Sequence, residues 1–292
     1  MKLSFGIKTV PVDTTFDELA EIWQEADGIP AIEHAWLWDH FLPLRGPVET
    51  PIHEGWTMLS ALAARTRRLR LGLMVTGNMS RPPAVLAKMA ATVDDISHGR
   101  LVLGLGAGAT RQPGDTLGPR EFGAYGLPLV SPGEGVARLA ESCEIIRRLW
   151  REDHFDFDGR HYQLRDAVLR PKPATAPPLL LGGWGDRILG VVAEYADVWN
   201  VPGPPHNTLD FLADRSKALD ERCAAIGRDP GTIVRSTQLF VDYPDPAATR
   251  RTIGDLMSIG FGHFVLNIVR PAPDHVARWV AEEIIEPVQT AQ

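Results

Sequence analysis

Two residues that can do acid–base chemistry end a hydrophobic run near the N-terminus. The stretch "WLWDHF" (36–41) reads as a buried strand that stops on Asp39 and His40, whose side chains are costly to bury without partners. An imidazole gains or loses a proton near neutral pH, so His40 is a candidate general acid or base. The alternative is structural, with Asp39 capping the next loop and His40 hydrogen-bonded within the fold.

Glycine-rich turns follow two further apolar runs. The stretch "GLGAGA" (104–109) fits the GxGxxA pattern of dinucleotide sites, but that pattern requires a helix to open at once. Pro113 and Pro119, with the glycines beside them, oppose such a helix. These glycines could let a flat ligand lie against the backbone, or could serve only packing and turns. The stretch "GGWGD" (182–186) precedes a predicted helix whose N–H groups could bind a phosphate, with a plain tight turn as the alternative.

These residues fall at corresponding places in a repeating pattern of short apolar runs and amphipathic helical stretches. The expected strands are 3–7, 33–38, 70–76, 101–106, 178–183, 196–200, 234–240 and 263–267. The expected helices are 16–26, 56–66, 82–96, 133–150, 187–195, 209–226, 246–259 and 275–285. Eight βα units in order, with no break that looks like a linker, predict an α/β fold in which residues 1–292 form a single (β/α)8 TIM barrel domain.

Two segments interrupt this rhythm. Residues 107–132 are rich in glycine and proline and lack periodicity, which predicts a long loop over the C-terminal mouth of the barrel. Residues 154–168 alternate in polarity around Asp158-Gly159, which is typical of a hairpin. Both are expected to be insertions in one domain.

Residues at the carboxyl ends of barrel strands face one shared cavity. Here they are mainly amides, hydroxyls and glycines: Lys8, Thr9, Asp39, His40, Val75, Thr76, Asn78, Ala107, Gly108, 182–185, Asn200, Gln238 and Asn267. Such a set suits a large polar ligand held by neutral hydrogen bonds better than a hydrolase with paired carboxylates. Neither HxH, HExxH nor GxSxG occurs, so no metal site and no serine nucleophile are expected.

Composition argues against several classes of function. A formal charge of −7, with acids and bases interleaved, disfavours a nucleic-acid partner. No run of ~20 apolar residues predicts a membrane span, and the N-terminal apolar run is too short for a signal peptide, so a cytoplasmic protein is expected. Cys143 and Cys223 stand far apart without a CxxC motif, which indicates reduced thiols.

Several motifs together resemble the luciferase-like monooxygenase superfamily and, within it, the deazaflavin (F420)-dependent oxidoreductases. The matching stretches are "WLWDHFLPL" (36–44), "EGWTMLSALAARTRRLRLG" (54–72), "LMVTGNMSRPPAVLAKMAATVDDISHGRLVLGLGAG" (73–108), "FGAYGLPL" (122–129) and "LLLGGWGDRILGVVAEYADVWN" (179–200). The resemblance implies a barrel that binds F420 or FMN in its C-terminal mouth, acts on a small molecule by two-electron chemistry, and forms a homodimer.

The resemblance also implies roles for single residues. Asp39 would hydrogen-bond near the reactive face of the ring, and His40 would lie beside the reacting carbon. The cofactor site would comprise a bulge after the third strand, small residues under the ring and a turn near the phosphate: Val75, Thr76, Asn78, Gly106, Ala107, Gly108, Gly182, Gly183 and Trp184. A cis peptide bond often accompanies this bulge, and Met74-Val75 is the expected position.

One departure narrows the function. Family members that oxidise sugar phosphates carry a catalytic Glu after GxGxG, where this chain has Ala109, which argues against that activity. The favoured function is F420-dependent hydride transfer to or from a small organic substrate, with His40 handling the proton. The alternatives are a reduced-FMN-dependent monooxygenase and a cofactor-binding protein without turnover. Three arginines, Arg81, Arg111 and Arg120, are predicted at the rim, where they would favour the carboxylate-rich tail of F420.

Overall fold

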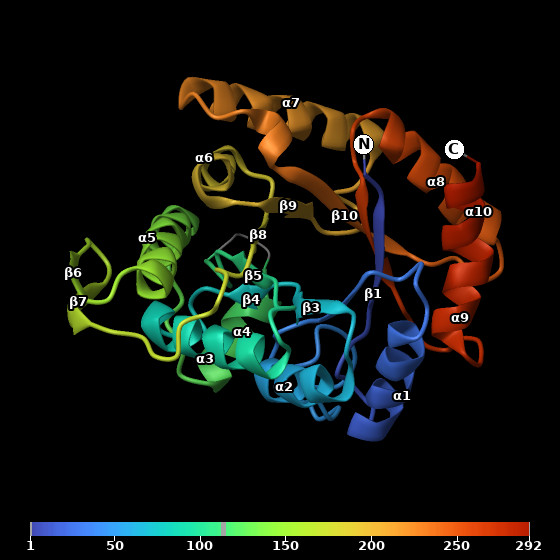
Figure 1. Cartoon of the computed structure of the whole chain (residues 1–292), viewed down its shortest axis with the longest axis horizontal. Helices are drawn as coiled ribbons and strands as arrows, with labels where there is room; N and C mark the ends of the chain where they lie inside the picture. Colours follow the sequence, from blue (N-terminus) through green and yellow to red (C-terminus); the bar gives the residue numbers. More distant parts are fainter. Residues whose placement is uncertain (1, 112–114, 292) are drawn as a thin grey trace.

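The computed structural model describes residues 2–111 and 115–291, and within them nine strands form one parallel sheet. The strand order is β3-β2-β1-β11-β10-β9-β8-β5-β4. A parallel bridge between Leu71 and Leu101 links β3 to the residues before β5, so the sheet nearly closes on itself. Figure 1 shows the helices around the outside of this sheet. The predicted α/β barrel is confirmed.

The predicted strands all occur, but the third is broken in two. The strands of the barrel are β1 (Ser4–Lys8), β2 (His34–Leu37), β3 (Arg70–Leu73), β4 (Thr76–Gly77), β5 (Leu103–Gly106), β8 (Leu179–Gly182), β9 (Val198–Val201), β10 (Val234–Phe240) and β11 (His263–Asn267). The break between β3 and β4 contains a cis peptide bond at Met74-Val75. This confirms the cis bond predicted at that position.

The helices also follow the predicted order. They are α1 (Phe16–Asp27), α2 (Gly55–Arg65), α3 (Pro83–Ile96), α5 (Pro132–Arg151), α6 (Asp186–Tyr195), α7 (Leu209–Ala225), α8 (Pro246–Ser258), α9 (Val276–Val280), a π-helical turn (Ala281–Ile285) and α10 (Glu286–Thr290). Sequence signals explain several starts. Thr15 and Glu18 form a reciprocal capping box at α1, and Ser131 accepts a hydrogen bond from the backbone of Glu134 at α5.

The apolar core has two parts. Alternate strand residues such as Phe5 and Phe264 pack outward against the helices in one large cluster. A smaller cluster, which includes Trp36 and Val265, comes from the opposite face of the same strands and fills the barrel interior. Both faces of each strand are covered, so most strand residues are apolar. The strands therefore appear in the sequence as the short apolar runs from which they were predicted.

The segment 107–132 is not a simple loop, which corrects the sequence prediction. It contains α4 (Leu117–Ala124), in which Pro119 falls in the first turn, where its missing N–H costs no helical hydrogen bond. The Asp115 carboxylate accepts hydrogen bonds from the backbone N–H groups of Leu117 and Gly118 and so starts the helix. Pro113, which also entered the argument against a helix, lies outside the described residues.

The second insertion is the predicted hairpin. Its strands, β6 (Phe155–Asp158) and β7 (Gln163–Ala167), are antiparallel and lie beside α5 at the edge of the molecule (Figure 1). Glu141 of α5 holds the turn by accepting backbone hydrogen bonds from residues 160–162. Along the described residues, no helix has both the length and the apolar composition needed to cross a membrane.

Candidate active site

The carboxyl ends of the strands surround a cavity of about 860 Å³. This volume lies in the range of small-molecule and cofactor sites. Most of the predicted site residues line it: Asp39, His40, Val75, Gly106, Ala107, Gly108, Gly182, Gly183 and Trp184. Thr76 and Asn78 do not line the cavity and are buried behind its wall.

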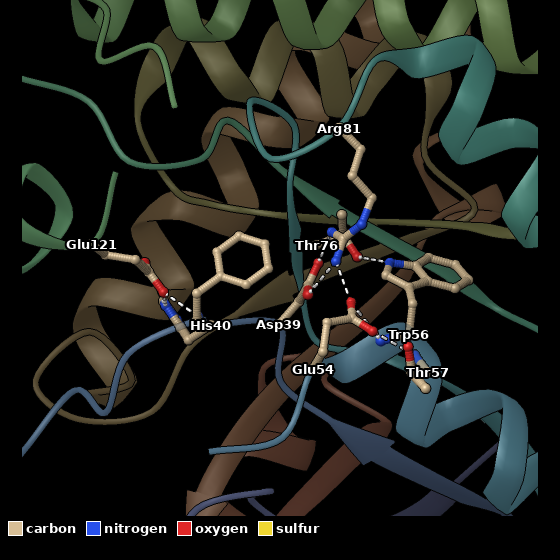
Figure 2. Close-up of polar contacts among 9 residues, drawn as sticks. Asp39, His40, Glu54, Trp56, Thr57, Thr76, Arg81 and Glu121 are labelled. Carbon is tan, nitrogen blue, oxygen red and sulfur yellow. Dashed lines mark hydrogen bonds and ion pairs between the residues drawn. The ribbon is translucent and has the colours of Figure 1, made fainter. Parts of the chain in front are cut away.

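His40 is held at this cavity by a carboxylate from the inserted helix α4. The His40 Nδ1 atom lies 3.0 Å from Glu121 Oε2 (Figure 2). Glu121 Oε1 accepts hydrogen bonds from the backbone N–H groups of Phe41 and Leu42. The Glu121 side chain is 8% exposed, whereas that of His40 is 34% exposed. The ring of Trp38 packs against the imidazole, with centroids 5.4 Å apart. The imidazole is therefore fixed on one side and open on the other.

Glu121 is ionised in this arrangement. Burial acts to raise the pKa of Glu121, but the hydrogen bonds from His40 and from two backbone N–H groups outweigh it and lower the pKa below the usual range. A carboxylate beside Nδ1 accepts the proton of that nitrogen and leaves Nε2 as the nitrogen that exchanges a proton with a ligand. This pair can therefore donate or accept a proton at the mouth of the barrel.

Asp39 is turned toward another partner. Arg81 binds both of its oxygens, with Nη1 at 2.5 Å from Oδ2 and Nη2 at 3.0 Å from Oδ1, and Arg81 also pairs with Glu54 at the start of α2 (Figure 2). Behind them, Trp56 donates to Thr76 Oγ1 at 3.0 Å. Burial raises the pKa of Asp39, and the hydrogen bonds from Arg81 oppose that rise. The network ties the end of β2 to the bulge after β3.

This network corrects the prediction for one of the three arginines. Arg81 is not a rim charge, because its side chain is 11% exposed and committed to two carboxylates. Arg111 and Arg120 are exposed, as a rim location requires. Asp39 lines the cavity, but its carboxylate is fully buried against Arg81, so a direct contact of that carboxylate with a cofactor stays a prediction.

One wall of the cavity is almost free of side chains. A Cβ atom added at Gly106 would lie 2.8 Å from Val75 Cγ2, and one added at Gly182 would lie 3.1 Å from Val75 Cγ1. The two glycines thus accommodate Val75, which the bulge projects onto the wall. This wall of small residues, with amides and a lysine on the other strands, suits a planar ring with polar edges such as that of F420 or FMN.

The turn after β8 carries the predicted phosphate site. Gly183 has φ of +138°, a conformation open to glycine, and α6 begins at Asp186 with no side-chain cap. Asp186 places a carboxylate in the first turn, and Arg215 neutralises it at 2.7 Å. Trp184 stacks on His206 with centroids 4.1 Å apart, so this end of the cavity has an aromatic wall.

Sequence reasoning missed Glu121. The signal available was its position directly before "FGAYGLPL", one of the stretches that resembles the luciferase-like family. Gly118 packs so closely on Ala109 that an added Cβ would lie 2.8 Å from the Ala109 Cβ, and this contact seats α4 with Glu121 at His40. No group of three or more metal-binding side chains occurs among the described residues.

The sequence matches one protein-family model and several characterised relatives. A family model described as "Luciferase-like monooxygenase" matches residues 4–243. The chain is 34% identical over 172 residues to the F420-dependent glucose-6-phosphate dehydrogenase of Amycolatopsis mediterranei (strain U-32), covering 56% of this chain and 46% of that protein. It is 31% identical over 216 residues to the pyrimidine monooxygenase RutA of Variovorax paradoxus (strain S110), covering 73% and 52%. The chain thus spans about half the length of these curated relatives.

A solved structure supports the fold along nearly the whole chain. An F420-dependent secondary alcohol dehydrogenase in complex with an F420-acetone adduct superimposes with a TM-score of 0.84 and covers 99% of both chains. Its sequence identity is 18%, so the likeness concerns the fold.

Proposed function

Because the chain belongs to the luciferase-like monooxygenase family, we propose that it is an F420-dependent oxidoreductase that transfers a hydride to or from a small organic substrate. The observation that carries this proposal is the His40–Glu121 pair at the mouth of the barrel. Reduction of a carbonyl group needs one hydride and one proton, and oxidation of an alcohol releases both. Bound F420 supplies or accepts the hydride. The protein must then supply the proton and the orientation.

The residues of the cavity divide these tasks. His40 exchanges the proton through Nε2, and Glu121 holds the imidazole by Nδ1. The wall formed by Val75, Gly106 and Gly182 supports the flat face of the ring. Asp39 acts through Arg81 to fix the strand end that presents His40. With Ala109 in place of a carboxylate, sugar phosphates are not favoured substrates.

A second candidate function has a specific observation in its favour. The similarity to RutA supports a reduced-FMN-dependent monooxygenase, since that relative is a monooxygenase. A cofactor-binding protein without turnover would have no use for a proton-exchanging pair, so we rank it third. A single domain spanning the chain, a cytoplasmic location and a homodimer are further parts of the proposal, and the last is open to size-exclusion chromatography with light scattering.

An anaerobic turnover assay tests the proposed function. The protein is mixed with reduced F420 and a panel of ketones, enones and imines, and with oxidised F420 and a panel of alcohols, while the absorbance of the cofactor is followed. We expect cofactor turnover with at least one compound, and turnover lowered by about 10²- to 10⁴-fold in His40→Ala. Oxygen uptake that requires reduced FMN, together with inert F420, would instead support the monooxygenase.

A further inference from the structure

A lysine that forms no ion pair with any of the described residues lines the cavity. Lys8 ends β1, its residue is 8% exposed, and its ammonium group donates to Gln238 Oε1 at 2.7 Å. The same nitrogen lies 5.9 Å from the ring centroid of Trp38. Lys8, Gln238 and Trp38 all line the cavity. The ammonium group therefore lies at the cavity wall with further N–H donors beyond the one that Gln238 accepts.

The partners of Lys8 are neutral and their orientation is fixed. Gln238 Nε2 donates to Asn200 Oδ1 at 2.9 Å, and Asn200 Nδ2 donates to Ser236 Oγ at 2.8 Å. Ser236 in turn lies 2.8 Å from His263 Nδ1, and burial lowers the pKa of His263 to about 4, so this imidazole is uncharged at neutral pH. These hydrogen bonds turn the Gln238 amide oxygen toward Lys8. None of the side chains in the series carries a negative charge that could balance the ammonium group.

Four carboxylates among the described residues line the cavity, those of Asp13, Asp39, Asp115 and Glu121, and none of them forms an ion pair with Lys8. Asp115 accepts hydrogen bonds from the backbone at the start of α4. Asp39 is bound by Arg81, and Glu121 is bound by His40 and the backbone. Within residues 2–111 and 115–291, Lys8 forms no ion pair. Burial lowers the pKa of Lys8 to about 8, which leaves most molecules charged at pH 7. A buried charge without a partner is costly, and an anion in the cavity would offset that cost.

The topology places this charge opposite the glycine wall of the cavity. In the sheet order, β8 lies four strands from β1 in either direction when β3 and β4 count as one broken strand. Lys8 and the Gly182 wall therefore face each other across the barrel, and a ring supported by that wall leaves the substrate between the two. The neighbouring strand β2 ends next to His40, so the proton-exchanging group adjoins the same space.

We propose that Lys8 binds an oxygen anion of the substrate, so that the compound acted on is an organic acid whose carboxylate lies on Lys8. This assignment rests on the proposed function, in which the cofactor ring lies on the Gly182 wall. It adds the chemical class of the substrate. A polar edge of the cofactor is the other possible source of a negative oxygen at Lys8. The two sources can be distinguished by experiment, because the binding of a small acid can be measured without the cofactor.

Isothermal titration calorimetry with benzoate and the isosteric neutral benzamide, without cofactor, tests the assignment. Wild type and the control Lys217→Met, which removes an exposed lysine on α7, should bind benzoate at least tenfold more tightly than benzamide. Lys8→Met should lose this preference while its benzamide affinity stays within threefold. Equal affinities in wild type, no benzoate binding at millimolar concentration, or an unchanged preference in Lys8→Met would each overturn the assignment.

Two further measurements complete the test. The chain has five lysines, so a 13C-NMR titration of the lysine Cε signals in wild type is readable even if Lys8→Met does not fold. Benzoate should raise the pKa of Lys8 by at least one pH unit, and an unchanged pKa would overturn the assignment. If Lys8→Met weakens F420 binding more than tenfold and keeps the benzoate preference, the charge serves the cofactor and the assignment is wrong. Failure of F420 to bind wild type would contradict the proposed function and leave the benzoate result readable.

Discussion

Replacing Glu121 by glutamine is expected to lower turnover far more than cofactor binding. In the structure, Glu121 Oε1 accepts backbone hydrogen bonds from Phe41 and Leu42, and Oε2 faces His40 Nδ1 at 3.0 Å. The backbone donors require an oxygen, so the amide oxygen of glutamine must take the Oε1 position. Its NH2 group then faces Nδ1, donates to it and forces the proton of the neutral imidazole onto Nε2.

The size of the effect follows from this wrong tautomer. His40 can then no longer accept a proton at Nε2, and its charged form loses the adjacent carboxylate. General acid–base catalysis contributes about 10²- to 10⁴-fold, and we expect a loss of that order in the rate of hydride transfer. The fold should survive, because glutamine still accepts the two backbone hydrogen bonds. The affinity for F420 should stay within about threefold, since Glu121 acts through His40 and not on the ring.

The assay is anaerobic stopped-flow turnover of bound F420 in the two single variants and the double variant. If Glu121 acts only by positioning His40, adding Glu121→Gln to His40→Ala should cause little further loss, because coupled residues are not additive. Glu152→Gln removes a carboxylate from an exposed ion pair with Arg148 and serves as the control, with unchanged turnover. A Glu121→Gln rate within threefold of wild type, or losses that multiply in the double variant, would refute the positioning role.

Three other predictions concern stability and the cavity wall. Arg81→Met should lower the free energy of unfolding by ~3–5 kcal/mol in urea titrations, because the Asp39 carboxylate is left buried and unpaired; a loss below 1 kcal/mol would contradict the ion pair. Gly106→Ala should cost ~1–3 kcal/mol and weaken cofactor binding through the clash with the bulge, whereas Gly190→Ala, with open space around it, should not destabilise. His263 has a pKa of about 4, below the ~6.5 of an exposed imidazole, so protonation favours the unfolded chain. The neutral imidazole therefore contributes about 3 kcal/mol to the free energy of unfolding above pH 6.5, and this contribution is lost as the pH falls toward 4. Urea titrations of His263→Gln should show a smaller loss over that interval, and an identical pH dependence would contradict the buried neutral imidazole.

Local patterns in the sequence were sufficient for most of the fold. Buried parallel strands appear as short apolar runs such as "LLLGG", and capped amphipathic helices have their own period, so both are visible without tertiary information. Helix α4 was missed because it has only eight residues, among them two glycines and a proline. What stabilises it is the Asp115 side chain and the contact of Gly118 with Ala109, and neither appears in a pattern of polarity.

The candidate site, too, was predictable from the sequence only in part. The rule that strand ends meet at one mouth was enough to bring His40, Lys8 and the glycine turns to one cavity. It could not show which side chains pair there. Glu121 is 81 positions from His40, and Arg81 is 42 positions from Asp39. Such partners are selected by the packing of separate elements, and a charge assigned to the rim from its place in the chain can turn inward, as Arg81 does.

An equilibrium titration of the protein with F420 and with FMN, each at about 50 and 500 mM salt, tests which cofactor the cavity binds. F420 should bind with a Kd in the micromolar range or lower and at least as tightly as FMN. The affinity for F420 should fall as salt rises, because the exposed Arg111 and Arg120 attract its carboxylate tail through water, while FMN responds little. Binding of FMN more than tenfold tighter than F420, a difference of ~1.4 kcal/mol, would contradict F420 as the cofactor and favour the oxygen-dependent alternative.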